Sequence, residues 1–239
     1  MGTTLPSLAE RRGDFDDWVK APLELDPDRI RVVKPYEGEK LPDPRLLSGV
    51  VITGSHDMIT DRNIWSELTA AWLPVVFEAG TPLLGICYGH QLIAHAMGGH
   101  VGLNPRGVEF GTVEIRLNDQ AVLDPLFRDF APALQFQACH SQSVITLPPE
   151  ATLLASNFKD PHQAFSIGET AWGVQFHPEF DADIVATYVK ECSDVLNADG
   201  IDPAGLLETI ENTPHGEALL RRFGKIIEEK ENLEQSYLQ

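Results

Sequence analysis

The chain has 239 residues, of which 43% are hydrophobic and 23% charged, and this composition excludes the disordered and fibrous classes of protein. Its 18 Lys and Arg against 36 Asp and Glu give a formal net charge of -18, which disfavours nucleic acid and anionic membranes as partners. Three cysteines are too few for a disulfide framework. No stretch approaches the roughly 18 consecutive apolar residues of a membrane span, and no secretory signal is evident. We therefore expect a cytoplasmic protein.

In the first half of the chain, short apolar runs alternate with a longer helical pattern, which is typical of βαβ units and a mainly parallel sheet. The predicted strands are residues 30–33, 49–53 and 82–86. A helix is predicted over residues 61–79, with Gly80 as its stop. Pro74 lies inside this helix, and we expect a kink or a break there because proline lacks the N–H of the helical ladder.

After Gly99 the pattern changes to short strands without intervening helices, which predicts hairpins and an antiparallel extension. The predicted strands are residues 112–117, 134–138, 143–147, 151–155, 164–167 and 171–176. Helical spacing returns over residues 181–197 and closes at Gly200. Thr213 and Pro214 then predict the start of a last helix.

No internal repeat or long linker divides the chain. We therefore expect a single domain over residues 1–239, with a core at about 28–198 and a C-terminal helical extension at 199–239 that ends in a solvated tail from residue 231. The expected fold class is α/β, an open, mainly parallel twisted sheet flanked by helices with a small antiparallel strand extension.

The most informative stretch is Gly85-Ile86-Cys87-Tyr88-Gly89, which joins a predicted strand to a predicted helix. This GxCxG pattern is the cysteine counterpart of the nucleophile elbow, in which flanking glycines allow a turn too tight for side chains. The helix N-terminus would also favour negative charge on the Cys87 sulfur, which is the reactive form. A buried structural cysteine between two packing glycines is the alternative interpretation.

A second motif, GVQFHPEF at residues 173–180, places His177 and Glu179 just beyond an apolar strand. Residues two apart in an extended chain face the same side, so this carboxylate can orient the imidazole and stabilise its charged form. A surface His-Glu pair in a turn is the alternative. Both motifs follow strands, at the sheet edge where α/β proteins place their sites, and this favours a catalytic arrangement with Cys87.

LLGICYGHQLIA at residues 83–94, together with GVQFHPEF, resembles the class I glutamine amidotransferases with a Cys-His-Glu triad, in particular the stand-alone GMP synthase-like members. The resemblance covers about residues 50–196 and implies a flavodoxin-like fold. It implies that glutamine is hydrolysed through a glutamyl thioester and that no cofactor is needed.

In this resemblance Cys87 would attack the side-chain amide, His177 would move the proton to the leaving ammonia, and Glu179 would orient His177. The oxyanion would be bound by the N–H of Tyr88 and by a backbone N–H of the loop TGSH, residues 53–56. Many relatives have two glycines in that loop, whereas this chain has Gly54 and Ser55. The implied substrate contacts are Gln91, Phe110, Gly111, Cys139 and His140.

Two of these assignments have alternatives. Gln91 could be an exposed helix residue, and His140 could fill a niche in the core. Gln142 stands where many relatives have an aspartate. The histidines at positions 90, 95 and 100 recur every five residues, a spacing that rotates them around a helix, so we expect no metal site.

The expected substrate is glutamine or a γ-glutamyl compound. The chain has no GxxxxGK[ST] phosphate loop, so the ammonia would pass to a separate synthetase subunit. One alternative is a γ-glutamyl peptide or amide hydrolase with water as the acceptor. Others are a catalytically idle regulatory or binding subunit and a related cysteine enzyme with another substrate, which Gln91 disfavours.

Family members begin with an apolar strand, whereas this chain starts at MGTTLP, which resembles the segment just after that strand. We therefore hypothesise that the numbered chain is short by one strand, because loss of a central strand would leave unpaired strand edges. A gap one strand wide between residues 30–33 and 49–53 would support this hypothesis, and direct pairing of the two segments would contradict it.

Overall fold

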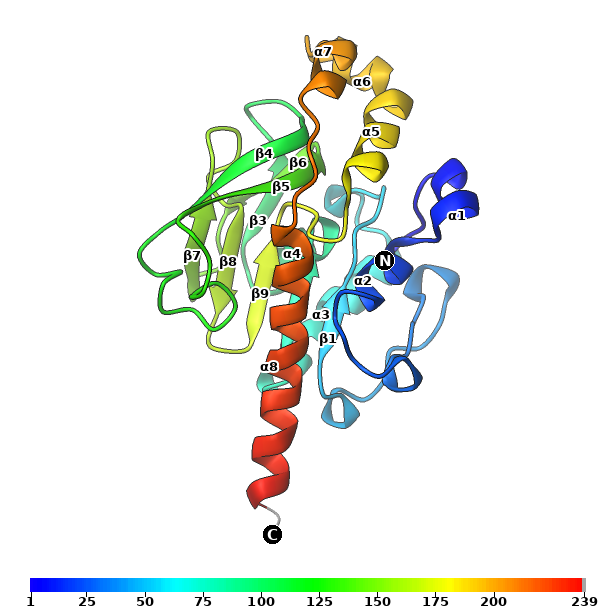
Figure 1. The fold of residues 1–239 in the computed structure, drawn as a ribbon. Coiled ribbons are helices and arrows are strands. Elements are labelled where there is room, and N and C mark those ends of the chain that lie inside the picture. The colour runs from blue at the N-terminus through cyan, green and yellow to red at the C-terminus, as the bar shows by residue number, and fades with distance from the viewer. Residues whose placement is uncertain (238–239) are drawn as a thin grey trace.

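The computed structural model describes residues 1–237 and is built around a mixed sheet (Figure 1). Within these residues the sheet has seven strands in the order β1-β2-β9-β8-β7-β4-β5. Their bounds are β1 Val50–Ile52, β2 Leu83–Ile86, β4 Glu109–Leu117, β5 Ala133–His140, β7 Ala151–Ser156, β8 Ala164–Ile167 and β9 Ala171–Val174. A separate antiparallel pair is formed by β3, His100–Leu103, and β6, Gln142–Thr146.

Helices cover both faces of the parallel part of the sheet (Figure 1). Their bounds are α1 Pro6–Arg12, α2 Phe15–Lys20, α3 Ile64–Glu78, α4 Tyr88–Ala96, α5 Ala182–Glu191, α6 Ser193–Ala198, α7 Pro203–Glu208 and α8 His215–Tyr237. Side chains alternate along β2, so Leu84 and Ile86 join the core beneath α8, whereas Leu83 joins the core beneath α3 and α4. The sheet is thus buried on both sides at the strands that carry the GxCxG and GVQFHPEF motifs.

The predicted α/β class, with a helix-flanked sheet and a small antiparallel extension, is confirmed. Parallel pairing joins β1 to β2 and β2 to β9, while the pairs from β9 through β8, β7 and β4 to β5 are antiparallel. The description "mainly parallel" therefore holds only for the side of the sheet formed by β1, β2 and β9. Most of the predicted antiparallel strands belong to this same sheet and form its other side. The predicted strands of the second half all form, but β3 was not predicted.

Three helical predictions need correction. α3 runs without a break across Pro74, because the missing N–H removes a single bond from a helix whose buried face is packed on the core. The helix predicted over 181–197 is two helices, since Cys192 ends α5 and α6 starts at Ser193. The expected solvated tail is helical as far as Tyr237, and its last two residues lie outside the described part.

Residues 30–33 are not a strand, because this extended segment has no strand beside it to pair with. β1 pairs with β2 on one side, and its other edge faces a cavity that residues 30–33 also line. The two segments are therefore separated and do not pair directly. No helix within residues 1–237 combines the length and the apolar character that crossing a membrane requires.

Candidate active site

Cys87 occupies the turn between β2 and α4 in a backbone conformation that is rare for a residue with a side chain. Its φ is 50° and its ψ is -97°, and such strain is typical of nucleophile elbows. The Cys87 N–H donates to the carbonyl oxygen of Val174 at 2.8 Å, which secures the turn to β9. The side chain is 7% exposed and lines a cavity, so it is not sealed in apolar packing.

The two flanking glycines are required by close packing of α4 on the sheet. A Cβ on Gly85 would lie 2.4 Å from the carbonyl oxygen of Gly89, and a Cβ on Gly89 would lie 2.2 Å from that of Ile52. Neither contact is sterically possible without movement of the backbone. The steric role predicted for both glycines is therefore confirmed.

Parallel pairing brings the two motifs to one edge of the sheet. Ile86 at the end of β2 is paired with Val174 at the end of β9, so the residues that follow these two strands emerge side by side. The N–H of His177 donates to the carbonyl oxygen of Gln137 at 2.8 Å, forming a bridge to β5. This bridge holds the His177 backbone in place beyond the end of β9.

The imidazole of His177 lies between a carboxylate and a thiol. Its Nδ1 is 2.8 Å from Oε1 of Glu179, and both side chains are almost fully buried. Nε2 is thereby left without a hydrogen bond to another described residue and available to Cys87, whose sulfur acts electrostatically on the ring and donates to the carbonyl oxygen of Cys139 at 3.8 Å. Burial alone would lower the pKa of His177, but the Glu179 carboxylate and the Cys87 sulfur outweigh it and raise the pKa to about 10. The imidazole is therefore charged at neutral pH.

Aromatic residues hold the His177 ring in this orientation. Phe180 stacks on it with ring centroids 3.9 Å apart, and Phe15 of α2 lies parallel to it at 6.4 Å. Gly54 also approaches closely, since a Cβ there would lie 3.1 Å from Cε1 of His177. The N-terminal helices and the TGSH loop thus lie beside the imidazole and help to exclude water from it.

A cavity of about 320 Å³ opens beside Cys87. It is lined by Leu5, Ser55, His56, Asp57, Met58, Cys87, Tyr88, Gln91, Phe110, Cys139, His140, Ser141, Gln142, Tyr188, Cys192 and Val195. Most residues predicted for the oxyanion and substrate contacts are among them. Two are not: Gly54 lies against His177, and Gly111 lies beside Leu206 of α7.

Gln91 is buried in the wall of this cavity and is not an exposed helix residue. Its Nε2 donates to the carbonyl oxygen of Gln142 at 2.8 Å and to Oε1 of Gln175 at 3.0 Å. With both amide hydrogens engaged, the side chain is fixed with respect to the segment after β5. The sequence alternative for Gln91 is thus wrong.

Gln142 connects this wall to the turn after the TGSH loop. Its Oε1 accepts from the N–H of Ile59 at 3.0 Å, and its Nε2 donates to Oγ1 of Thr60 at 2.7 Å. The amide therefore ties down the 3₁₀ turn η4, Ile59–Asp61. The Thr60 hydroxyl can donate as well as accept, so a carboxylate could make contacts of the same kind, and these two hydrogen bonds do not by themselves require glutamine at position 142.

His140 forms a second buried pair with a glutamate. Its Nε2 is 2.9 Å from Oε2 of Glu109, and its Nδ1 is 3.0 Å from the carbonyl oxygen of Gln142. Both neighbours are acceptors, so both ring nitrogens carry a hydrogen and the imidazole is charged. Burial opposes this charge, but Glu109 outweighs it and raises the pKa of His140. His140 both lines the cavity and fills a polar niche.

Several wall residues were not predicted, because they come from elements distant in the sequence. His56 lies in the quoted TGSH loop, and its Nε2 is 3.0 Å from the hydroxyl of Tyr188. Tyr188 lies on α5 and Cys192 caps the end of that helix, four residues later in the predicted helical segment. Asp57 supplies a carboxylate, held by the Ser55 hydroxyl at 2.8 Å. The helical spacing of Tyr188 and Cys192 was the one feature of the sequence that could have placed these two residues on the same wall.

Among the described residues, no group of three or more His, Cys, Asp or Glu side chains is arranged to hold a metal ion. His95 is engaged by Glu67 and Arg62, and His100 is exposed on β3. Beside Cys87 the groups brought together are a thiol, an imidazole and a carboxylate, an arrangement suited to nucleophilic attack on a carbonyl.

Comparisons with known proteins agree with this geometry. The family model for class I glutamine amidotransferases matches residues 32–188. The chain is 34% identical over 166 residues to the glutamine-hydrolyzing GMP synthase of Albidiferax ferrireducens, covering 66% of this chain and 28% of that protein. It is 36% identical over 138 residues to the GMP synthase of Salmonella typhimurium, covering 55% and 25%. The chain thus spans about a quarter of the length of these curated relatives.

The solved structure of a glutamine amidotransferase from Thermotoga maritima has a TM-score of 0.69 to this one at 28% sequence identity, covering 82% of this chain and 84% of that chain. The match of the family model extends over most of the chain and includes both Cys87 and the His177-Glu179 pair. The chain therefore belongs to the class I glutamine amidotransferase family.

Proposed function

We propose that this protein hydrolyses the side-chain amide of glutamine, with Cys87 as the nucleophile. One observation carries the proposal: the Cys87 thiol, at a strained turn, lies beside the imidazole of His177, whose Nδ1 is held by Glu179 at 2.8 Å. These three groups lie beside a cavity of about 320 Å³, at the small end of the range for ligand sites and suited to a single amino acid.

In the first half of the reaction Cys87 attacks the amide carbon as the thiolate, its proton being the one carried by His177, and the carbonyl oxygen becomes negatively charged. His177 gives its proton to the leaving nitrogen as the carbon-nitrogen bond breaks, so ammonia departs and a glutamyl thioester remains. In the second half His177 takes a proton from water, which attacks the thioester. Glutamate leaves and the Cys87 thiolate and the charged His177 are restored, so glutamine and water give glutamate and ammonia.

The negative oxygen needs hydrogen-bond donors that are already in place. Tyr88 is the first residue of α4, so its N–H has no partner within the helix. Gly54 is close to the His177 ring, and the adjacent loop is closed by hydrogen bonds between Ser55 and Asp57. We assign the oxyanion contacts to the N–H groups of Tyr88 and Gly54, with the Ser55 hydroxyl occupied in shaping the loop.

Substrate recognition would use the polar groups around the same cavity. Asp57 offers a carboxylate for the α-ammonium group, and Gln91 and the backbone at Cys139 and His140 offer polar groups to the rest of the amino acid. Phe110 supplies an apolar wall for the methylene groups. A matched carboxylate is the expected partner for a buried ammonium group.

The test is an assay of glutamate and ammonia released from L-glutamine by the purified chain and by Cys87→Ala, with γ-glutamyl amides as parallel substrates. We expect equimolar glutamate and ammonia from the natural sequence, and a loss of at least about 10⁴-fold in Cys87→Ala. The exposed His100→Ala serves as a control for handling and folding. Turnover of γ-glutamyl amides without turnover of glutamine would assign the enzyme to the alternative substrate class. A folded protein inactive on all of them would contradict the proposal.

A further inference from the structure

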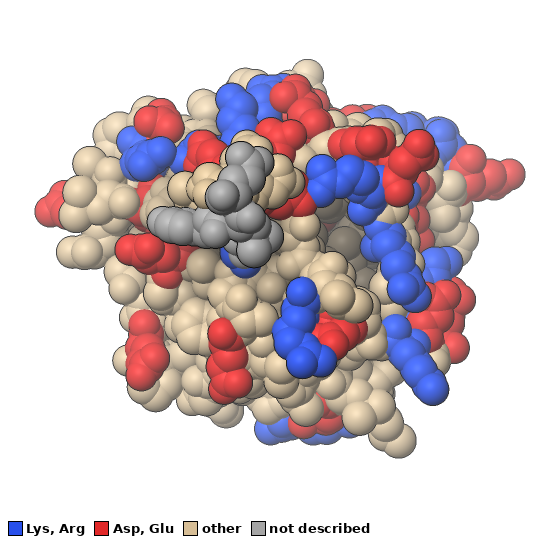
Figure 2. All heavy atoms as spheres, turned by 90° about the horizontal axis from the view of Figure 1, so that it is seen from below, with Lys and Arg blue, Asp and Glu red and all other residues tan. Residues whose placement is uncertain are grey.

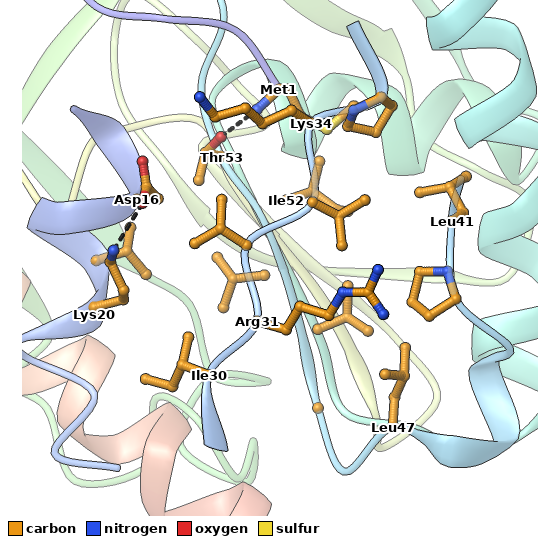
Figure 3. A pocket seen from close by; sticks show the side chains of 18 of the residues that line it. Met1, Asp16, Lys20, Ile30, Arg31, Lys34, Leu41, Leu47, Ile52 and Thr53 are labelled. Carbon is orange, nitrogen blue, oxygen red and sulfur yellow. Dashed lines mark hydrogen bonds and ion pairs between the residues drawn. The ribbon is translucent and has the colours of Figure 1, made fainter. Parts of the chain in front are cut away.

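The TGSH loop, residues 53–56, is a wall between two cavities. Ser55 and His56 line the cavity beside Cys87. Thr53 lines a larger cavity of about 550 Å³ beside β1, and Figure 3 shows it at one end of that cavity. Basic side chains also line the larger cavity, and the face of the molecule seen from below is hollowed beside Lys and Arg side chains (Figure 2). Because the loop has a cavity on each side, packing holds it less firmly than it holds a buried strand.

The sheet does not hold the backbone of this loop. The pairing of β1 with β2 ends at Ile52, which lies opposite Gly85. Within the described part of the chain, residues 53–57 make no hydrogen bond between backbone groups. The loop nevertheless carries the Gly54 N–H that we assign to the oxyanion, and an oxyanion donor is effective only where it is held in place before the reaction. Side-chain contacts must therefore set the position of this N–H.

His56 connects the loop to α5. Its Nε2 is 3.0 Å from the hydroxyl of Tyr188, a side chain that is 2% exposed. Burial, and next the charge of His177, lower the pKa of His56, so its neutral ring can accept the proton of that hydroxyl. The Tyr188 hydroxyl is also 2.8 Å from Oγ1 of Thr4, which can donate to it. His56 is thus bonded to a hydroxyl group that is itself fixed.

Two other polar contacts of this region have a different effect. Oγ of Ser55 and Oδ2 of Asp57 are 2.8 Å apart, so this contact shapes the segment without joining it to another element. Oδ1 of Asp57 accepts from Nδ2 of Asn63 at 3.1 Å, at the start of α3. The contact of His56 differs from both, because it joins the loop to the helix that packs beside the catalytic imidazole.

The same contact closes a circuit of aromatic rings around that imidazole. Phe180 stacks on His177 with ring centroids 3.9 Å apart, and Tyr188 stacks on Phe180 at 5.2 Å. His56 meets the ring of Tyr188 edge-on at 5.6 Å and that of Phe15 at 6.2 Å. Phe15 completes the circuit, since it lies parallel to His177 at 6.4 Å. Rings packed in this way do not move independently, so the loop and the imidazole are positioned together.

We propose that His56 and Tyr188 are a positioning pair, whose hydrogen bond fixes the TGSH loop so that the Gly54 N–H points to the oxygen that becomes charged when Cys87 attacks. Neither side chain carries a proton in this reaction. The inference rests on the proposed hydrolysis of glutamine and adds to it the residues that hold one oxyanion donor. Because this donor acts on the charge of the transition state, loss of the pair should lower kcat and leave KM nearly unchanged.

The first test is the steady-state rate of glutamine hydrolysis by variants of the full chain. Tyr188→Phe removes the hydroxyl but keeps the ring, so kcat should fall by about 10- to 100-fold with KM changed by less than about 3-fold. His56→Ala should lower kcat at least as much, whereas the amide of His56→Gln can still bond to Tyr188 and should recover kcat to within about 3-fold. Thr4→Val is the matched control, because it removes the other hydrogen bond of the Tyr188 hydroxyl, and should keep kcat within about 3-fold.

The double variant tests whether the two residues act through one hydrogen bond. Adding Tyr188→Phe to His56→Ala should lower kcat by no more than about 2-fold further, because the bond is already lost. Effects that multiply would overturn the pair. Full kcat in Tyr188→Phe, or a His56→Gln variant as slow as His56→Ala, would overturn it as well.

Two further measurements separate loss of the oxyanion donor from general damage to the site. Iodoacetamide alkylates Cys87 through a saturated carbon and needs no oxyanion donor, so Tyr188→Phe should keep the alkylation rate within about 2-fold. The NMR order parameter of the Gly54 N–H should fall from about 0.85 toward about 0.6 in Tyr188→Phe and stay unchanged in Thr4→Val. A parallel fall of alkylation and kcat, or an unchanged order parameter, would overturn the proposal.

The order parameter also keeps this inference separate from the proposed function. If the natural sequence hydrolyses neither glutamine nor γ-glutamyl amides, the proposed function fails. The Gly54 order parameter in Tyr188→Phe and Thr4→Val then still decides whether His56 and Tyr188 position the loop.

Discussion

Two buried His-Glu pairs lie near Cys87, and they differ in what the second ring nitrogen contacts. His177 is held by Glu179 at 2.8 Å and His140 by Glu109 at 2.9 Å. The free nitrogen of His177 faces the thiol of Cys87, whereas that of His140 is bonded to the carbonyl oxygen of Gln142. One imidazole can therefore exchange a proton with a reacting group, and the other cannot.

The surroundings of the two carboxylates reinforce this difference. Glu109 also accepts hydrogen bonds from Asn157 at 2.7 Å and from Gln163 at 2.6 Å, so its charge is fully compensated. Oε2 of Glu179 has no hydrogen-bond partner among the described residues, which leaves more of its charge to act on His177. A His-Glu pair is thus suited to proton transfer only where the second ring nitrogen has no hydrogen bond within the protein. Where that nitrogen is hydrogen-bonded, the pair has a structural role.

The largest expected effect is that of removing the imidazole of His177, whose second ring nitrogen is free for proton transfer. His177→Ala should lower kcat for glutamine hydrolysis by about 10⁴-fold or more, because both proton transfers lose their carrier. The exposed His100→Ala should retain full activity. The measurement is the steady-state rate of glutamate release, and a loss of less than about 10-fold in His177→Ala would contradict the assignment.

A smaller loss is expected when the carboxylate that orients His177 is neutralised. Glu179→Gln keeps the size of the side chain but removes its charge, and kcat should fall by about 10²- to 10⁴-fold. The pKa of His177, followed by NMR of the ring, should also drop from about 10 toward its usual range. A structural role alone would not move this titration, so an unchanged pKa would argue against the positioning role.

The charged state of His177 predicts the pH dependence of alkylation. Below about pH 10 the proton is on the imidazole, so positive charge stays beside the Cys87 sulfur through the neutral range and is lost as the pH rises past that value. Iodoacetamide at pH 6.5 should therefore label Cys87 at least about 10-fold faster than Cys139, because burial raises the pKa of the Cys139 thiol. Faster labelling of Cys139, measured by peptide mapping, would contradict this picture.

The pair of His140 and Glu109, in which both ring nitrogens are hydrogen-bonded, should affect the stability of the fold more than the rate of catalysis. Glu109→Gln leaves the buried His140 without its counter-ion, which should cost about 3 kcal/mol in urea unfolding and change kcat by less than about 10-fold. The pKa of His140 is raised in the folded state, so its stabilising contribution is present below the usual histidine pKa and lost at higher pH. Glu109→Gln should lack this loss, and a 10³-fold fall in kcat without destabilisation would make the pair catalytic instead.

The central residues of the site were predictable because the signals for them are local. Gly85 and Gly89 around Cys87, and the two-residue spacing of His177 and Glu179, are properties of short strand-to-loop segments. Their convergence followed from parallel pairing of β2 with β9. The partner of His140 was not predictable in this way, because Glu109 is 31 residues away and reaches it through the β4-β5 register.

The incorrect predictions share a different cause. Residues 30–33 have the β-branched pattern of a strand, but a strand exists only where another one pairs with it. The wall residues on α5 look like core positions, since a helix that lines a cavity and one that lines a core have the same spacing. Pro74 is tolerated because packing of α3 outweighs one lost hydrogen bond. Tertiary context, absent from local patterns, decided all three.

The most direct test of the central claim is covalent trapping with 6-diazo-5-oxo-L-norleucine, a glutamine-like alkylating agent, followed by peptide mass mapping of the intact chain. The account predicts one adduct, located on Cys87, whose formation is slowed by glutamine and parallels the loss of activity. An adduct on Cys139 or Cys192 in place of Cys87, or loss of activity with Cys87 unmodified, would contradict it.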